Sequence, residues 1–144
     1  MLQRVLPAYR VPFFDLLASA CRGGLSLAAG QPQPDESIAV ASRLEVARLN
    51  PLRNLHFRSP SSSSYLCWQR GWLSWLEAWQ PDVLVVEANP RYLSTPRLVR
   101  WMHARGKPVL GWGLGTGAAS EGSSWLAQRR RRFLLAFDGM LAYS

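Results

Sequence analysis

A chain of 144 residues with 48% hydrophobic side chains is long enough to form one domain with a buried core, which excludes a wholly disordered protein. Seventeen basic and nine acidic side chains give a formal net charge of +8, so the surface attracts phosphates of nucleic acids, nucleotides or anionic lipids, although a GC-rich genome produces the same arginine excess. No apolar run reaches about eighteen residues, which excludes a membrane-spanning segment.

The amino-terminal part of the chain predicts three strands and one helix. Strands are expected at residues 3–7, 25–29 and 54–57, and a helix that begins at Pro12 presents an apolar face to the core. The turn before that helix contains no glycine, so it is neither a dinucleotide-binding fingerprint nor a phosphate-binding P-loop. Residues 37–48 form either a short helix or an irregular crossover.

The centre of the chain predicts a strand, a helix and a second strand. Residues 83–86 are an unbroken apolar run, which is typical of a strand buried on both faces. Pro96 fits the first turn of the following helix, Gly106 ends that helix, and residues 109–112 form the next strand. Such a βαβ unit is almost always parallel and right-handed.

A tryptophan-rich helix is expected just before this unit, at residues 65–79. Trp72, Trp75 and Trp79 form a stripe along it, which usually means packing in the core or against another domain. Contact with a membrane interface is the alternative.

The carboxyl-terminal part predicts a helix at residues 123–136 and a last strand at residues 140–143. Four consecutive arginines, residues 129–132, fan around this helix, so at least two of them are solvated. They form either a solvated helix face or a patch that binds phosphates or anionic lipid.

Strands and helices alternate throughout, which predicts an α/β fold. We expect residues 1–144 to form a single Rossmann-like domain, with a doubly wound parallel sheet of about six strands in the order 3-2-1-4-5-6 and helices on both faces. A domain rarely stops one residue after an inner strand with nothing to cover it. We therefore expect the chain to be the amino-terminal portion of a longer protein.

Ligands of an open parallel sheet bind at the carboxyl ends of its strands. Glu87, Asn89 and Arg91 follow one predicted strand, and Gly113 and Gly115 follow the next, so we expect function there. The Glu87 carboxylate either contacts an acceptor molecule or hydrogen-bonds to loop amides. The glycines either allow close approach of the backbone or present N–H groups to an anion or a sugar hydroxyl.

The other chemically versatile side chains form no recognisable site. Cys21 and Cys67 fall in predicted helices without metal-ligand spacing, which indicates free thiols in a reducing compartment. His56 and His103 are isolated, and a structural or surface role fits each better than a catalytic one. The sequence thus indicates no metal site and identifies no catalytic residue.

Four segments carry a resemblance to a known family. They read VLPAYRVPFF at residues 5–14, DVLVVEANPRYLS at 82–94, GKPVLGWGLG at 106–115 and FDGMLAYS at 137–144. In this order and spacing, over nearly the whole chain, they resemble the amino-terminal domain of GT-B nucleotide-sugar glycosyltransferases. The resemblance implies two Rossmann-like domains that face each other across a cleft, the first receiving the acceptor and the second holding the donor.

By this resemblance, the chain is the acceptor-binding domain of an enzyme that transfers a sugar from a nucleotide sugar to a glycan or glycolipid, inactive without its carboxyl-terminal domain. No cofactor is expected in this domain, because the donor would bind the other half. The chain differs from the family at its W-G-H-G loop, because Leu114 stands in place of the histidine that would touch the transferred sugar. The residues expected to line the acceptor side are Tyr9, Arg10, Glu87, Asn89, Arg91, Gly113 and Gly115.

The expected partners are a carboxyl-terminal donor-binding domain and a glycan or glycolipid acceptor. We also expect a cytoplasmic location with peripheral contact to the anionic inner face of the membrane, and self-association over apolar surface that the second domain would cover. Nucleic acid is not an expected partner. The alternative function is a non-catalytic Rossmann-like module that binds a phosphorylated ligand or a protein.

Overall fold

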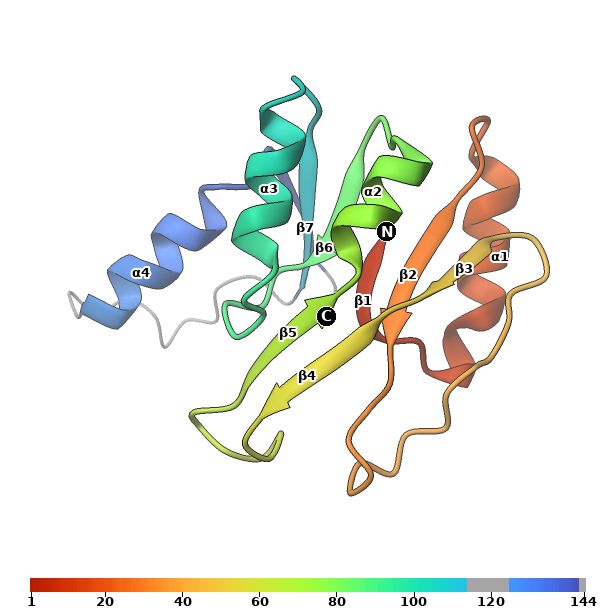
Figure 1. The fold of residues 1–144 in the computed structure, drawn as a ribbon. Helices are drawn as coiled ribbons and strands as arrows, with labels where there is room; N and C mark the ends of the chain where they lie inside the picture. The colour runs from red at the N-terminus through yellow and green to blue at the C-terminus, as the bar shows by residue number, and fades with distance from the viewer. Residues whose placement is uncertain (114–124, 143–144) are drawn as a thin grey trace.

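The computed structural model describes residues 1–113 and 125–142 (Figure 1). Its main sheet has six strands in the order β3-β2-β1-β6-β7-β8, and every neighbouring pair is parallel. Numbered along the chain within this sheet alone, that order is the expected 3-2-1-4-5-6, and the predicted doubly wound α/β class is confirmed. The strands are β1 (Leu2–Val5), β2 (Ser26–Gly30), β3 (Arg48–Pro51), β6 (Leu84–Glu87), β7 (Val109–Gly113) and β8 (Gly139–Ala142).

Helices cover both faces of this sheet (Figure 1). On one face lies α1 (Val11–Ala20), which the chain enters through the 3-10 turn η1 (Ala8–Arg10). On the other face lie α2 (Trp72–Trp79) and α3 (Thr95–His103), and α4 (Trp125–Leu134) follows beside α3. Prolines occupy the first turns of α1 and α3, where a missing N–H costs nothing.

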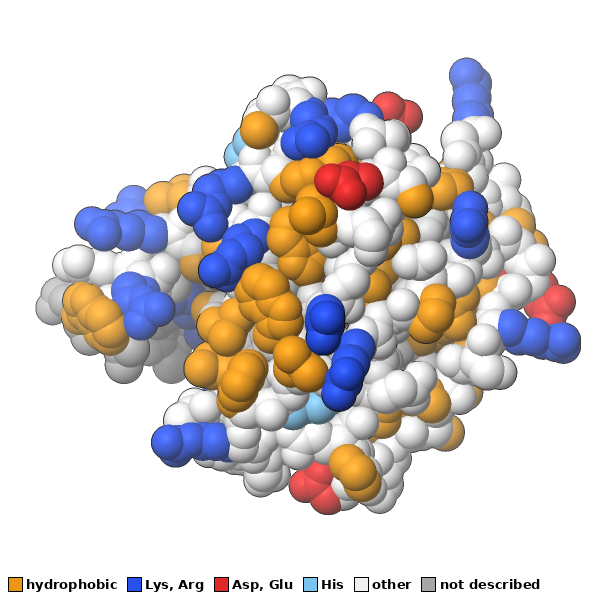
Figure 2. All heavy atoms as spheres, viewed as in Figure 1, with side chains coloured by type: hydrophobic (Ala, Val, Ile, Leu, Met, Phe, Trp, Pro, Cys, Tyr) orange, Lys and Arg blue, Asp and Glu red, His pale blue; other side chains and the backbone are white. Residues whose placement is uncertain are grey.

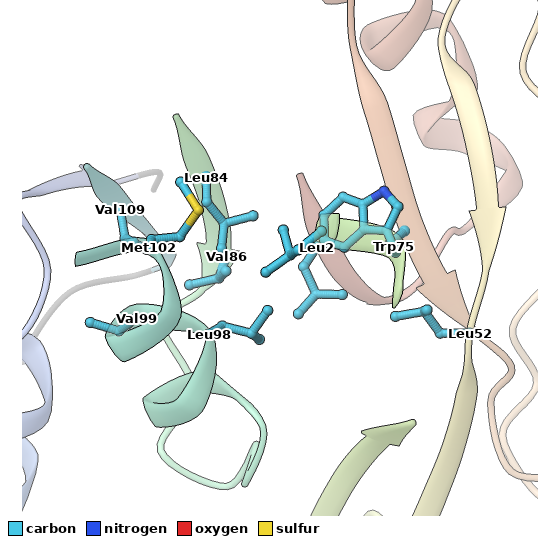
Figure 3. Packing of buried hydrophobic residues seen from close by; sticks show 11 residues of the cluster. Leu2, Leu52, Trp75, Leu84, Val86, Leu98, Val99, Met102 and Val109 are labelled. Atoms are coloured by element: carbon cyan, nitrogen blue, oxygen red, sulfur yellow. The ribbon is translucent and has the colours of Figure 1, made fainter. Parts of the chain in front are cut away.

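The larger hydrophobic core lies between the sheet and the α2–α3 layer (Figure 3). Leu84 and Val86 point from β6 toward Leu98 and Met102 of α3, and all four are fully buried. Because alternate strand residues face opposite sides, the remaining apolar residues of the same strands can fill the opposite core.

The smaller core lies under α1 and is centred on the fully buried Phe14, which packs with Leu6 and Leu27. It does not extend across the whole face. Farther along the sheet, on β8 and at the entry to β6, Leu141 is 45% and Val83 47% exposed. This side of β6–β8 therefore keeps apolar surface that no described helix covers.

Two strands form a separate antiparallel hairpin, and this corrects one prediction. β4 (Arg53–Phe57) pairs with β5 (Leu66–Arg70), so residues 54–57 are not the third strand of the main sheet. That place belongs to β3, a short strand with two exposed and two partly buried residues. Residues 37–48 contain no helix: residues 37–47 form the irregular crossover, and β3 begins at Arg48.

The helix predicted at residues 65–79 is wrong in its first half, which is β5. Gly71 separates strand from helix with a φ of +100°, a conformation that side-chain-bearing residues rarely adopt. Cys67 therefore lies buried on a strand rather than in a helix, and Cys21 follows the last turn of α1.

The tryptophan stripe of α2 belongs to the core. Trp75 is buried and donates a hydrogen bond from Nε1 to Ser26 Oγ at 2.8 Å. Trp72 and Trp79 are partly buried against the same cluster. The structure therefore places Trp75 in the core, and membrane contact through the partly buried Trp72 and Trp79 stays a prediction.

The predicted carboxyl-terminal elements are α4 and β8, and all four arginines at residues 129–132 are exposed. Gly115 and Leu114, which carried expectations about the glycine-rich loop, lie outside the described residues. None of the helices within residues 1–113 and 125–142 combines the length and apolar character needed to cross a bilayer.

Two glycines of β7 give a test of this packing. A Cβ on Gly111 would lie 2.5 Å from Met140 Sδ and 2.9 Å from Phe137 Cδ2, whereas one on Gly113 would make ordinary contacts with Ala88, at 3.5 Å from its Cβ and 3.9 Å from its carbonyl oxygen. We expect Gly111→Ala to lower the free energy of unfolding by about 1–2 kcal/mol through overpacking. Gly113→Ala is the matched control, and equal urea denaturation midpoints for the two variants would contradict this packing of Gly111 against Phe137 and Met140.

Candidate functional site

The sheet opens at the boundary between β1 and β6. These strands share one register pair, Leu2 with Val86, whereas the β6–β7 ladder has four. The order of the sheet also reverses here, because α1 leads from β1 to one side and α3 leads from β6 to the other on the opposite face. The carboxyl ends of β1 and β6 therefore form the topological switch point, where open α/β sheets bind ligands.

Side chains replace the ladder bonds that are missing at this boundary. Glu87 Oε2 accepts the Arg4 backbone N–H at 2.5 Å, and the Gln3 carbonyl accepts Gln69 Nε2 at 3.0 Å. Gln69 Oε1 in turn accepts a hydrogen bond from Ser94 Oγ at 3.3 Å. Burial raises the pKa of the Glu87 carboxyl, and the Arg4 N–H bond and the charges of Arg4 and Arg10 oppose that rise.

The Arg4 side chain forms a largely covered ion pair beside this opening. Its guanidinium donates two hydrogen bonds to Glu36, at 2.6 and 2.7 Å, and the two side chains are 14% and 13% exposed. Hydrogen bonding to Arg4 lowers the pKa of Glu36, which also accepts the Gln33 N–H at 2.8 Å. The loop after β2 is thus held against the end of β1.

Hydroxyl and thiol groups surround the same end of β1. The Gln31 carbonyl lies 3.1 Å from His56 Nε2 and can only accept, so Nε2 donates to it, and His56 Nδ1 lies within hydrogen-bond distance of the Tyr65 hydroxyl, at 2.8 Å. Burial raises the pKa of Tyr65 to about 12 and also raises the pKa of Tyr92 and Cys67. These groups keep their protons near neutral pH, so they are hydrogen-bonding groups rather than activated nucleophiles.

Of the residues expected at the acceptor side, Tyr9, Arg10 and Glu87 lie together at this edge. Arg10 Nη1 donates to Gln3 Oε1 at 3.1 Å, and its guanidinium lies 5.6 Å from the Tyr9 ring centroid and 6.0 Å from that of Trp112. Tyr9 itself is 77% exposed. The edge therefore presents an open aromatic ring and a partly buried cation side by side.

Asn89, Arg91 and Gly113 reach the same edge from β6 and β7. Asn89 Oδ1 accepts the Arg91 N–H at 3.0 Å and shapes the turn, which leaves the Arg91 side chain exposed. Gly113 ends β7 beside Ala88, whose N–H donates to the Trp112 carbonyl at 2.8 Å. Whether any of these residues contacts an acceptor stays a prediction.

Sequence reasoning missed the covered layer beneath these residues. Gln3 and Arg4 are polar residues in a strand at the centre of a buried sheet, where apolar residues are usual. Their presence there could have indicated a buried polar layer. Glu36 and Gln69 gave no comparable indication. Glu36 lies in a loop, and Gln69 lies in a segment that was wrongly predicted as helix. Gln3 Nε2 is buried without a hydrogen-bond partner, a cost that a purely structural strand would avoid.

The arrangement suits neutral hydroxyls and phosphates. Gln3 of the buried layer holds the Arg10 guanidinium in place, and the exposed side chains of Tyr9 and Arg91 lie at the same edge as further donors. Within the described ranges, no group of three or more His, Cys, Asp or Glu side chains could hold a metal ion.

We expect Glu87→Gln and Glu87→Ala to differ in stability. Glutamine keeps an oxygen for the Arg4 N–H, whereas alanine leaves that donor unpaired and should cost about 2 kcal/mol. Because burial raises the folded-state pKa of Glu87, its ionisation lowers stability as the pH rises above the ordinary 4.5, and glutamine removes that loss. Urea unfolding near neutral pH should find Glu87→Gln at least as stable as the parent. A large loss in Glu87→Gln would contradict this account.

Glu36 has the opposite pH dependence. Its lowered pKa stabilises the fold above the ordinary value of 4.5, and this contribution disappears as the pH falls through the folded-state value. We expect Glu36→Gln to cost about 2–3 kcal/mol near neutral pH, because Arg4 loses its counter-charge, and the difference from the parent to shrink in acid. Glu45→Gln removes an exposed ion pair with Arg43 and should change stability by less than about 0.5 kcal/mol at either pH.

Comparison with known proteins does not assign the chain to a family. No family model, no curated protein and no solved structure matched it. The case for its function therefore rests on the residues at the carboxyl edge of the sheet and on the resemblance of its sequence segments.

Proposed function

We propose that this chain is the acceptor-binding domain of a glycosyltransferase that transfers a sugar from a nucleotide sugar to a hydroxyl of a glycan or glycolipid. The observation that carries the proposal is the opening between β1 and β6, where Tyr9, Arg10 and Glu87 meet at the switch point. These residues come from two of the segments that resemble the family.

The geometry at the edge favours an acceptor over a nucleotide sugar. The turn between β1 and α1 has no glycine, and Pro12 removes one of the N–H groups at the start of α1 that a phosphate would use. The open ring of Tyr9 instead offers a face for a sugar, and Arg10 and Arg91 offer charge to a phosphate on a lipid-linked acceptor.

An uncovered groove supports the existence of a further partner. About 700 Å³ of space lies between α1 and the β6–β8 part of the sheet, with Phe13, Leu17, Val85, Trp112 and Leu141 among its lining residues. The groove reaches the amino ends of β1 and β6 at Met1 and Val83, and it approaches the proposed site only through Phe13 and Trp112. A donor-binding domain that packs against the sheet could cover this apolar surface. A second copy of the chain is the other candidate for covering it.

Ligand titration tests the proposal. We expect isothermal titration to detect oligosaccharides or a water-soluble lipid-phosphate glycan, while nucleotide sugars bind no more tightly than about 1 mM, or −4 kcal/mol. Tyr9→Ala and Arg91→Ala change exposed side chains at the edge and should each weaken acceptor binding about tenfold, near 1.4 kcal/mol. Arg48→Ala, at the opposite end of the sheet, is the matched control.

Two results would count against the acceptor domain. Micromolar binding of a nucleotide sugar by this chain would overturn the division between acceptor and donor domains. Binding of simple phosphorylated compounds that Tyr9→Ala leaves unchanged, without any glycan binding, would favour the non-catalytic binding module.

A further inference from the structure

The β4–β5 hairpin exposes apolar residues where a surface hairpin normally exposes polar ones. Its inward residues include His56, Cys67 and Gln69, which pack or hydrogen-bond beneath it. On the outer side, Phe57 is 49% and Leu66 37% exposed. We call this outer side the hairpin face; its cross-strand pairs are Arg53 with Arg70, Leu55 with Trp68, and Phe57 with Leu66.

Two like charges stand directly opposite each other on the hairpin face. Arg53 and Arg70 are exposed cross-strand partners, a placement that is unfavourable unless an anion lies near both. Within the described part of the chain, no acidic side chain forms a salt bridge with either of them. The pair therefore presents concentrated positive charge beside apolar side chains.

The apolar surface continues from the hairpin onto its neighbours. The Leu93 N–H donates to the Cys67 carbonyl of β5, and the Leu93 side chain is exposed. Leu73, at the start of α2, is exposed as well. A shallow hollow of about 400 Å³ separates β5 from α2, with Trp68 and Leu73 in its lining. Figure 2 shows this side of the molecule, where hydrophobic side chains gather among many basic and few acidic ones.

We propose that the hairpin face is a docking surface for an anionic phospholipid bilayer. Guanidinium groups bind lipid phosphates, and aliphatic and aromatic side chains enter the boundary between headgroups and acyl chains. Single-stranded nucleic acid fits less well, because Arg97 already covers the Trp68 ring at 4.7 Å, which leaves Phe57 as the one exposed ring of the hairpin face on which a base could stack. The surface adjoins the acceptor edge at Arg91, whose carbonyl accepts the Cys67 N–H at 3.0 Å. The proposal rests on other side chains than those of the acceptor edge, so it does not depend on the proposed function.

This placement differs from the one that the sequence indicated. The membrane alternative rested on the α2 tryptophans, of which Trp75 is buried and Trp72 and Trp79 are partly buried, and on the arginine run of α4. The hairpin combines charge and apolar surface on one side of two strands, whereas the arginine run spreads around its helix.

Vesicle flotation with matched variants tests the proposal. The parent should bind vesicles of mixed phosphatidylcholine and phosphatidylglycerol but not phosphatidylcholine alone, and high salt should release it. The double variant Arg53→Gln/Arg70→Gln should bind about twenty-five-fold more weakly, from about fivefold per arginine. Arg131→Gln/Arg132→Gln removes the same charge from α4 and should change binding less than about twofold.

A third variant separates insertion from charge. Phe57→Ser/Leu66→Ser keeps every arginine and changes only exposed side chains, so it should fold and still lose at least about tenfold in vesicle binding. Equal losses in the hairpin and α4 charge variants would show that only net charge matters and would overturn the proposal. So would equal recovery with both kinds of vesicle, or retention on single-stranded DNA without vesicle binding. Unchanged circular dichroism establishes that each variant is folded.

Discussion

The hydrogen bond from the Arg4 N–H to the Glu87 carboxylate controls the geometry of this protein. It lies where the ladder between β1 and β6 stops, and it allows two central strands to separate without leaving that donor unpaired. A carboxylate in this position carries a cost, because burial raises its pKa. The carboxylate lies at the boundary between β1 and β6, the strands whose following helices, α1 and α3, cover opposite faces of the sheet.

The hairpin depends on the same opening. Gln69 bonds to the Gln3 carbonyl and Asn54 Nδ2 bonds to the Arg4 carbonyl at 2.7 Å, so each strand of the hairpin is attached to the end of β1. The hairpin is thus joined to the main sheet by hydrogen bonds from side-chain amides, not by backbone pairing between strands. The proposed membrane surface and the proposed acceptor edge consequently share a single buried polar layer while facing different partners.

The sequence predicted the helices and strands that have a local pattern of their own. It did not predict the elements and side-chain contacts that depend on residues far apart in the chain. The run at residues 83–86 and the proline-initiated helices carry their own signals, and parallel strand ends meet by geometry, so Glu87 and Arg10 could be placed together. β3 is too short and polar to be recognised, and dense apolar residues masked the break at Gly71. Glu36 could not be found, because its partner Arg4 is 32 residues away.

The position of β1 also has a consequence for folding during synthesis. Arg4 and Glu87 are 83 residues apart, whereas β6 and β7 are joined by one helix, so the second contact closes a much shorter loop. A growing chain therefore exposes one edge of β1 until β6 has left the ribosome. Polar Gln3 and Arg4 on that waiting edge reduce its tendency to pair with strands of other nascent chains, which gives them a protective role before the native contacts exist.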